Sequence, residues 1–417
     1  MPLRSTGPRR HTLTHRPGDA TARGPLSHRD FRILWASTVL AGAGFRAQSV
    51  ALGWLILEST DSAFMVGLGL GVSMAPNAVF GLLGGAMVDR YDRRRVLTLG
   101  AIAMGLNSLV LGFVALGDTD LVVLLLFTFA GGSLWSVQQT ARQSYAFDIV
   151  GSTTAVRGLS LTNLAQRFGG IAGGLGAGLV LSRAGAGEAY FATAVCFLAA
   201  GVVIALARSA GDSAPLHRTA VLTNLREYTR EIGRNRTLAT LIALTAAVEI
   251  LGFSHMSALP ILARDKLGGD GGTLGLLTAV SAAGGIIGIL LFSVFGDRIP
   301  RGLAFLAVLC VFGVSIMLLG ASNSLVFAIG ALVLVSSLAA LSDVLSQSLV
   351  QLSVPNEMRG RAMGSWMLAI GMAPGGHLQM GALASAFGVS TALFLNGAGL
   401  LVLAIVAGVA VGRVRRL

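Results

Sequence analysis

Long apolar stretches alternate with short polar breaks along nearly the whole chain. Each stretch is long enough to cross a ~30 Å hydrocarbon layer as a helix that rises about 1.5 Å per residue. The apolar residues are continuous and do not occupy every second position, which indicates helices and not the strands of a membrane barrel. We therefore expect an all-α membrane protein with twelve transmembrane helices, at residues 31–57, 63–88, 96–116, 121–146, 156–181, 187–208, 239–263, 273–296, 302–321, 325–350, 360–385 and 390–411.

Composition agrees with this pattern and argues against a soluble enzyme. Hydrophobic residues make up 54% of the 417 and charged residues 12%, whereas soluble chains carry about 25% charged residues. The chain has no Walker loop, no zinc-ligand spacing and no paired acids, and no soluble domain fits between the spans. We expect no catalytic centre, no cofactor and no metal.

The formal charge of +12 has two readings, a nucleic-acid partner or a topology signal. With both termini in the cytoplasm, 25 of the 31 Lys and Arg residues fall on the cytoplasmic side, three fall outside and three lie within spans. Basic residues concentrate on the cytoplasmic side of bacterial membrane proteins. The charge therefore predicts a multi-pass protein of the inner membrane, contacting the lipid bilayer and no nucleic acid.

The longest polar break lies near the middle and divides six spans from six. We expect a disordered basic cytoplasmic tail at 1–30, a six-helix bundle at 31–208, a linker at 209–238 and a second six-helix bundle at 239–417. Apolar residues recur at helical spacing within the linker, which predicts an amphipathic surface helix that either joins the bundles or regulates them; they are Val221, Leu225, Tyr228 and Ile232.

The two halves repeat a charged loop. Gly85, Asp89, Arg90, Arg93 and Arg94 follow or end the second span. Asp297, Arg298 and Arg301 follow the eighth span, and Asp297 lies 208 residues after Asp89. A duplicated six-helix unit with two pseudo-symmetric bundles explains the repeat, and such repeats place the substrate site near the midplane. A cytoplasmic Asp-Arg pair alone could be only a topology signal.

The first of these loops, with Asp92 in place of a glycine, resembles the signature of the major facilitator superfamily. Further segments resemble its branch of enterobactin-type siderophore exporters and drug exporters: Phe31-Arg32, Val50–Leu55, Ala141-Arg142-Gln143, Asp148, Leu259-Pro260, Arg264-Asp265, Leu274–Leu277, Val354-Pro355 and Arg359-Gly360-Arg361. The resemblance implies a rocking transporter whose charge clusters gate the cytoplasmic side. It also implies that Asp148 pairs with Arg93 or Arg94. The Gly-Pro pair that exporters of this superfamily often carry in span 5 is replaced by Gly170-Ile171.

Four charged residues fall well inside predicted spans, away from the span ends, where an ionised side chain costs about 2.5 to 3.5 kcal/mol on insertion scales. They are Arg46, Arg167, Glu249 and Asp343. The resemblance places Arg46, Glu249 and Asp343 on helices that line a central cavity. Each of the four calls for a partner, a wet cavity or a function.

Glu249 is our first candidate for a proton-coupling residue, because burial disfavours the charged form of a carboxylate. The alternative is a static ion pair with Arg46 or a polar packing role. Asp343 is a candidate for carrying protons or contacting a cationic substrate. Arg46 and Gln48 offer donors to an anionic or catechol-like substrate.

Other polar residues have plainer interpretations. We expect Arg167 to pair with Asp148 or Glu357 near an inner gate. Arg142, Asp148, Arg359 and Arg361 are expected at cytoplasmic helix ends, where charges reach water cheaply. His255 and His377 lie on different spans without ligand spacing, so we expect polar packing.

The function that follows is export of a siderophore-like or drug-like small molecule by alternating access with proton antiport, from a monomer. The alternatives are a flippase for lysophospholipids or similar molecules, and a membrane sensor or scaffold that transports nothing. A sensor would not need four charges within its spans.

Overall fold

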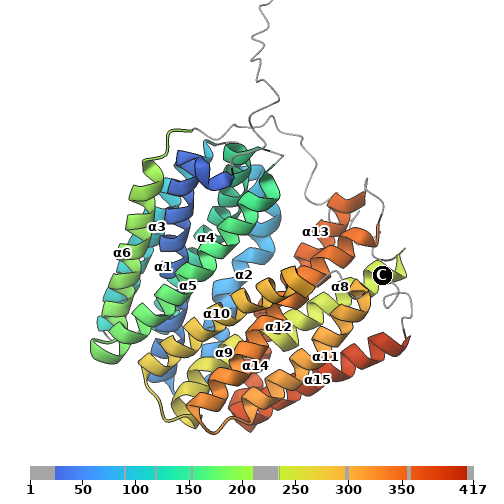
Figure 1. Ribbon diagram of the computed structural model, residues 1–417. Coiled ribbons are helices and arrows are strands. Elements are labelled where there is room, and N and C mark those ends of the chain that lie inside the picture. The colour runs from blue at the N-terminus through green and yellow to red at the C-terminus, as the bar shows by residue number, and fades with distance from the viewer. Residues whose placement is uncertain are drawn as a thin grey trace, which may run out of the picture.

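The computed structural model describes residues 24–88, 91–117, 120–151, 154–209, 233, 235–295, 300–354 and 358–410, with the backbone alone at 79–88, 156, 293–295, 359–361 and 410. All regular secondary structure in these ranges is helical (Figure 1). Residues 1–23 of the predicted tail and the residues of the predicted amphipathic linker helix lie outside the described residues. The last residues of the predicted tail are structured, as the short helix η1 (Pro25–Ser27) and the first turn of α1, which begins at Arg29.

Six long helices form the first half of the chain: α1 (Arg29–Thr60), α2 (Ala63–Val88), α3 (Arg93–Leu116), α4 (Leu121–Val150), α5 (Ala155–Arg183) and α6 (Ala186–Ala205). The second half contains α8 (Arg236–Ala247), η2 (Val248–Phe253), α9 (His255–Ile261), η3 (Leu262–Lys266), α10 (Gly271–Phe295), α11 (Arg301–Gly320), α12 (Leu325–Leu352), α13 (Arg359–Ile370), α14 (Ala373–Phe387) and α15 (Val389–Ala410). Ten of the described helical segments are long and apolar enough to cross a membrane. The count of twelve stays a prediction.

The seventh expected span is not a regular α-helix. Residues 236–266 run as α8, the π-helical turn η2, α9 and a second π-helical turn, η3. Pro260 lies inside α9 and lacks the N–H that a regular helix would use. Gly252 in η2 faces the Phe312 ring, and a Cβ there would lie 2.7 Å from Cε1. The eleventh expected span is likewise divided, between α13 and α14.

We call the end of the helices at which α3 and α11 begin, with Arg94 and Arg301, the basic end. Arg94 donates to the carbonyl of Ala205 at 2.9 Å, which joins the start of α3 to the end of α6. In the second half, Arg301 at the start of α11 donates to Ser348 of α12 at 3.2 Å. At the opposite end lie the α1–α2 and α5–α6 connections.

The two halves meet along two seams built from small residues. On the first, Gly174 and Gly178 of α5 face Gly275 of α10 so closely that no side chain fits between the backbones. On the second, Gly67 of α2 packs against Gly381 of α14, where a Cβ would lie 2.8 Å from the Gly381 Cα. Small residues let membrane helices approach closely.

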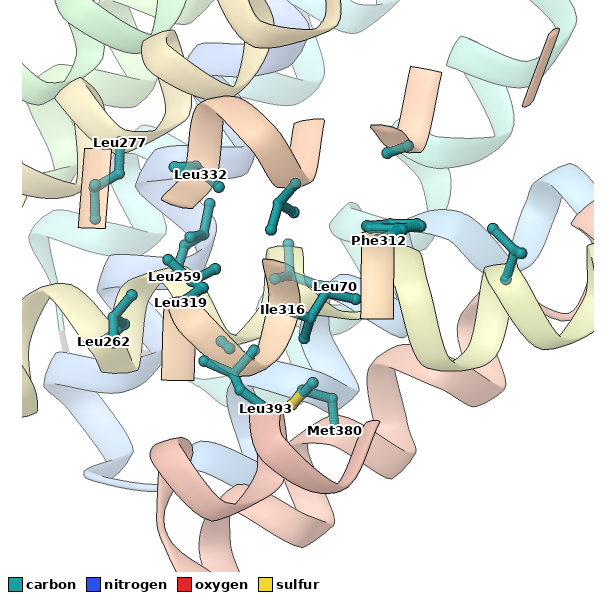
Figure 2. Close-up of a cluster of buried hydrophobic side chains, with 14 of the residues drawn as sticks. Leu70, Leu259, Leu262, Leu277, Phe312, Ile316, Leu319, Leu332, Met380 and Leu393 are labelled. Atoms are coloured by element: carbon teal, nitrogen blue, oxygen red, sulfur yellow. The ribbon is translucent and has the colours of Figure 1, made fainter. Parts of the chain in front are cut away.

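A buried cluster continues these seams into both halves. Leu70 of α2, Leu259 of α9 and Met380 of α14 belong to it (Figure 2). The first half has separate clusters nearer the basic end, centred on Tyr145 and on Phe197. In Figure 1 the ribbons of α2 and α4 diverge from those of α8 and α13 toward the basic end. The shared core therefore lies away from that end.

Candidate functional site

The four charged residues expected inside the spans form a cluster that crosses between the halves. Arg46 lies on α1 and Arg167 on α5, whereas Glu249 lies on η2 and Asp343 on α12. Arg46 and Arg167 are close enough to repel each other, and Asp343 attracts Arg167 and repels Glu249. Within the described residues, none of the four makes an ion pair.

Each arginine passes a glycine on a neighbouring helix, and the glycine beside Arg167 is the one that makes room for it. A Cβ at Gly170 of α5 would lie 3.7 Å from Cγ and 3.8 Å from Nε of Arg46. The guanidinium of Arg167 occupies the space over Gly285 of α10, where a Cβ would collide with Nη1 and lie 2.9 Å from Cζ. Arg167 therefore reaches from the first half onto a helix of the second.

Glu249 lies in the irregular part of the seventh span. Its side chain is 9% exposed, and its backbone carbonyl packs against Gly376 of α14, where a Cβ would lie 2.8 Å from it. Single π-helical turns inside α-helices occur frequently at functional sites. Asp343 is half-buried on α12. In the described part of the chain, neither carboxylate has a hydrogen-bond donor.

Gln48 faces α4 and not the arginine pair. Its amide and that of Asn107 both lie over Gly131, 3.1 and 3.0 Å from where a Cβ would be. It lines a small pocket together with Phe45, whose ring stacks on Trp135 with centroids 4.0 Å apart. The two residues therefore lie in different surroundings, and their contact with a substrate stays a prediction.

Arg142 is where the sequence expectation was wrong. It was placed at a helix end near water, yet it is only 2% exposed. Its guanidinium lies 5.3 Å from the centre of the Trp135 ring and donates to Gln139 at 3.0 Å. Gln139 and Gln166 also bond each other, which joins α4 to α5. Neutral amides and an aromatic face stabilise this buried cation.

The loop cluster at the basic end lies partly within the described residues. Arg93 pairs with Asp148, as the resemblance implied. Arg167 makes no ion pair with that carboxylate among the described residues, contrary to expectation; Glu357, its other expected partner, is outside the described residues. Asp92, which replaces the signature's glycine, accepts from the backbone N–H groups of Arg94 at 2.9 Å and Arg95 at 3.3 Å. It is the N-cap of α3.

The remaining loop residues are only partly placed. Gly85 lies within α2, and the backbones of Arg359 and Arg361 lie in α13. The predicted cluster members Asp89, Arg90, Asp297 and Arg298 lie outside the described residues.

The opposite end carries an ion pair between the halves that sequence reasoning missed. Arg264 of η3 donates to Asp61 Oδ1 at 2.6 Å and to the carbonyl of Leu57 at 3.1 Å. Asp61 ends α1 with φ = 50°, a left-handed conformation uncommon outside glycine. The sequence did contain a signal for this pair. Asp61 follows the first predicted span and Arg264 follows the seventh, and both spans end on the same side of the membrane.

The two histidines lie in the packed interior near the second seam. His377 shares a 2.5 Å hydrogen bond with Ser257, and His255 Nδ1 lies 2.7 Å from the carbonyl of Gly252. Nε2 of His255 has no partner among the described residues. No group of three potential metal ligands occurs in the described part of the chain.

Many apolar helices with charges enclosed between them define a multi-pass membrane transport protein. The chain belongs to the transmembrane secretion effector family of the major facilitator superfamily, which it matches over residues 20–415. It is therefore a transport protein and not an enzyme. A bacterial homologue of the human lysosomal transporter Spinster, solved inward-facing and unoccupied, superposes with a TM-score of 0.69 at 16% identity, covering 93% of this chain and 96% of that chain.

Curated relatives are a transporter, an exporter and a pump, each matched over most of its length. The enterobactin exporter EntS of Shigella flexneri is 25% identical over 82% of this chain and 81% of its own. The multidrug efflux pump Tap of Mycolicibacterium fortuitum is 26% identical over 93% and 96%. The staphyloferrin A transporter of Staphylococcus aureus is 21% identical over 88% and 92%.

Proposed function

We propose that this protein exports a siderophore-like or drug-like small molecule across the bacterial inner membrane by alternating access, driven by proton antiport. The charge cluster that crosses the seam is the observation that carries the proposal. Charges within a bilayer are costly, and they persist where they serve a pathway or a coupled site. In this proposal the chain has twelve spans in two six-helix bundles, both termini are cytoplasmic, and the basic end faces the cytoplasm.

The described conformation supports opening toward the cytoplasm. Glycine seams and the Arg264–Asp61 pair join the halves at the opposite end. The ribbons separate toward the basic end (Figure 1). A substrate would then enter between the halves from the cytoplasm, and the halves would rock about the central charges to release it outside.

Glu249 is the proposed coupling residue. It lies in a break of the helix and has no cation paired to it in the described structure. Among the charged groups of the cluster, Asp343 acts on Glu249 directly. Arg167 acts on Asp343, and Arg46 acts on Arg167 and on His255. Because an enclosed carboxylate with a like charge nearby is costly to ionise, it can bind a proton from outside and release it to the cytoplasm as the cavity alternates. Asp343 shares this role through its repulsion of Glu249.

Reconstituted protein tests this proposal. Proteoliposomes are loaded with an enterobactin-type catecholate, a cationic dye or a lysolipid, with and without a pH gradient. We expect the gradient to accelerate transport of one of the first two, and Glu249→Gln to abolish the acceleration. Equal transport without a gradient would refute antiport. Movement of lysolipid alone would favour a flippase, and no transport of any compound would favour a sensor.

The control for this experiment is Glu188→Gln. Glu188 lies in the first turn of α6 at the opposite end, away from the central cluster. The substitution removes the same charge by the same change of one atom. We expect it to leave the response to the gradient unchanged.

A further inference from the structure

The central charges are sorted by sign between the two halves. Both cations, Arg46 and Arg167, come from α1 and α5. Both anions, Glu249 and Asp343, come from η2 and α12. Asp343 attracts Arg167 across the seam, but no ion pair forms between the two sets among the described residues. The site therefore has a positive wall, Arg46 with Arg167, and a negative wall, Glu249 with Asp343, which interact through Arg167 and Asp343 without forming an ion pair among the described residues.

Each wall is electrostatically unfavourable by itself. The two guanidinium groups repel each other, and so do the two carboxylates. Arg46, Arg167 and Asp343 keep part of their surface exposed, whereas Glu249 is buried. Like charges in a low-dielectric site raise the free energy of that site unless a counter-charge arrives.

The walls are also held in place by the packing. Arg167 extends over Gly285, and its guanidinium fills a space that only a glycine leaves open, whereas Arg46 passes Gly170 at ordinary contact distance. Glu249 is fixed by the contact of its backbone with Gly376. Such placement favours a ligand with matching charges over loose counter-ions.

We propose that the central site binds an amphoteric substrate, with an anionic group such as a carboxylate on Arg46 and Arg167 and a cationic group such as an amine on Glu249 and Asp343. This inference rests on the proposed transport function and narrows its substrate class. A purely anionic ligand would leave the negative wall uncompensated and facing it. A purely cationic ligand would leave the positive wall without a counter-charge. Only a ligand with both charges satisfies both walls and connects the halves.

Binding to the full chain in nanodiscs, measured by isothermal titration calorimetry, tests the inference without any gradient. The probes are 4-(aminomethyl)benzoate and 8-aminooctanoate, two amphoteric compounds with different charge spacing. The single-charge analogues are benzoate, benzylamine, octanoate and octylamine. We expect at least one amphoteric probe to bind about tenfold or more tightly than both of its analogues, which corresponds to about 1.4 kcal/mol.

A variant of each wall should remove recognition of a different charge of the probe. Arg167→Gln should lower the affinity for the amphoteric probe to that of the amine, and leave the amine unchanged. Glu249→Gln should lower it to that of the carboxylate. Arg183→Gln, an exposed change at the far end of the same helix as Arg167, and Glu188→Gln are the matched controls and should bind like the parent.

Two results would overturn the inference. One is an analogue with a single charge that binds as tightly as the amphoteric probe. The other is a folded protein, shown by its thermal unfolding, that binds none of the six probes. If the charge pattern of binding holds but a pH gradient drives no transport, the proposed function fails and the binding site stands.

Discussion

The opposite end and the basic end of this protein are tied together in different ways. At the opposite end, the ties cross between the halves: Arg264 reaches Asp61, and Gly275 packs on Gly178. At the basic end, the described ties stay within one half, as in Arg93 with Asp148. The difference indicates which end is free to open without breaking its own polar contacts. Each half can move there as a body.

The largest effect is expected from filling the glycine seam. In Gly275→Ala, the new methyl carbon would collide with Gly178 Cα and lie 2.5 Å from the carbonyl of Gly174, and backbone atoms cannot yield. Overpacking costs about 1 to 3 kcal/mol, so we expect a lower unfolding temperature and transport near background. Gly176→Ala on α5 is the control, because nothing lies within 4 Å of its Cβ position. Parent-like stability and transport in Gly275→Ala would show that the seam is not closely packed.

A second substitution tests a tie within one half. Asp148→Asn removes a carboxylate from Arg93, which is 7% exposed. Breaking a largely buried pair costs up to about 3 to 5 kcal/mol, and Asp148 is partly exposed, so we expect a smaller loss of stability, about 2 kcal/mol. Thermal unfolding measures it. Because the pair lies within the first half, the opposite end should stay closed. Increased maleimide labelling of a cysteine placed at the opposite end would contradict the comparison.

A third substitution concerns the start of α3. Asp92→Ala removes the side chain that accepts from two backbone N–H groups. Loss of an N-cap costs about 1 kcal/mol, and unfolding temperature reports it. Asp92→Asn keeps an acceptor and should recover most of the loss. If alanine is as stable as aspartate, the residue has another role in the loop.

The smallest effect is expected from the tie between the halves. Asp61 is 84% exposed in its pair with Arg264, so the pair is worth at most about 1 kcal/mol, or about a fivefold change in population. We expect Arg264→Gln to raise maleimide labelling of a cysteine placed at the buried Ala258, in a background without Cys196 and Cys310. High salt should have the same effect on the parent.

The matched control for this pair is Lys266→Gln. Lys266 donates to the carbonyl of Gly320 and to Ser390, both at 2.6 Å and both in the second half. Its loss should lower stability without increasing labelling. Equal labelling in both variants would mean that Arg264 does not hold the halves together.

Much of the fold could be predicted from hydropathy, because a helix that crosses lipid must be long and apolar. The helix bounds agree with the expected spans within a few residues at α2 and α4, for example. The π-helical turns of the seventh span could not be predicted, since they depend on Phe312 packing against Gly252. Local sequence does not contain that tertiary contact.

The site was predicted less completely. The sequence was enough to choose Arg46, Arg167, Glu249 and Asp343 as candidates, because a charged residue stands out within an apolar span. Their roles stay predictions. Their surroundings were not predictable: Arg167 was expected to pair with Asp148 or Glu357, yet it makes no ion pair with Asp148 and its guanidinium lies over Gly285. Arg142 was expected at a helix end within reach of water, yet its guanidinium is enclosed by the Trp135 ring and the side-chain amide of Gln139. Which face of a helix a residue occupies, and what lies opposite, is decided by packing between the helices.

Distances across the two ends test the account most directly. Spin labels at Arg157 and Leu352 report the basic end, and labels at Arg183 and Asn323 report the opposite end; all four residues are exposed. We predict that, as pH is varied, one distance lengthens while the other shortens, and that Glu249→Gln abolishes this response. Two distances that stay constant, change together, or respond equally in Glu249→Gln would contradict alternating access coupled to Glu249.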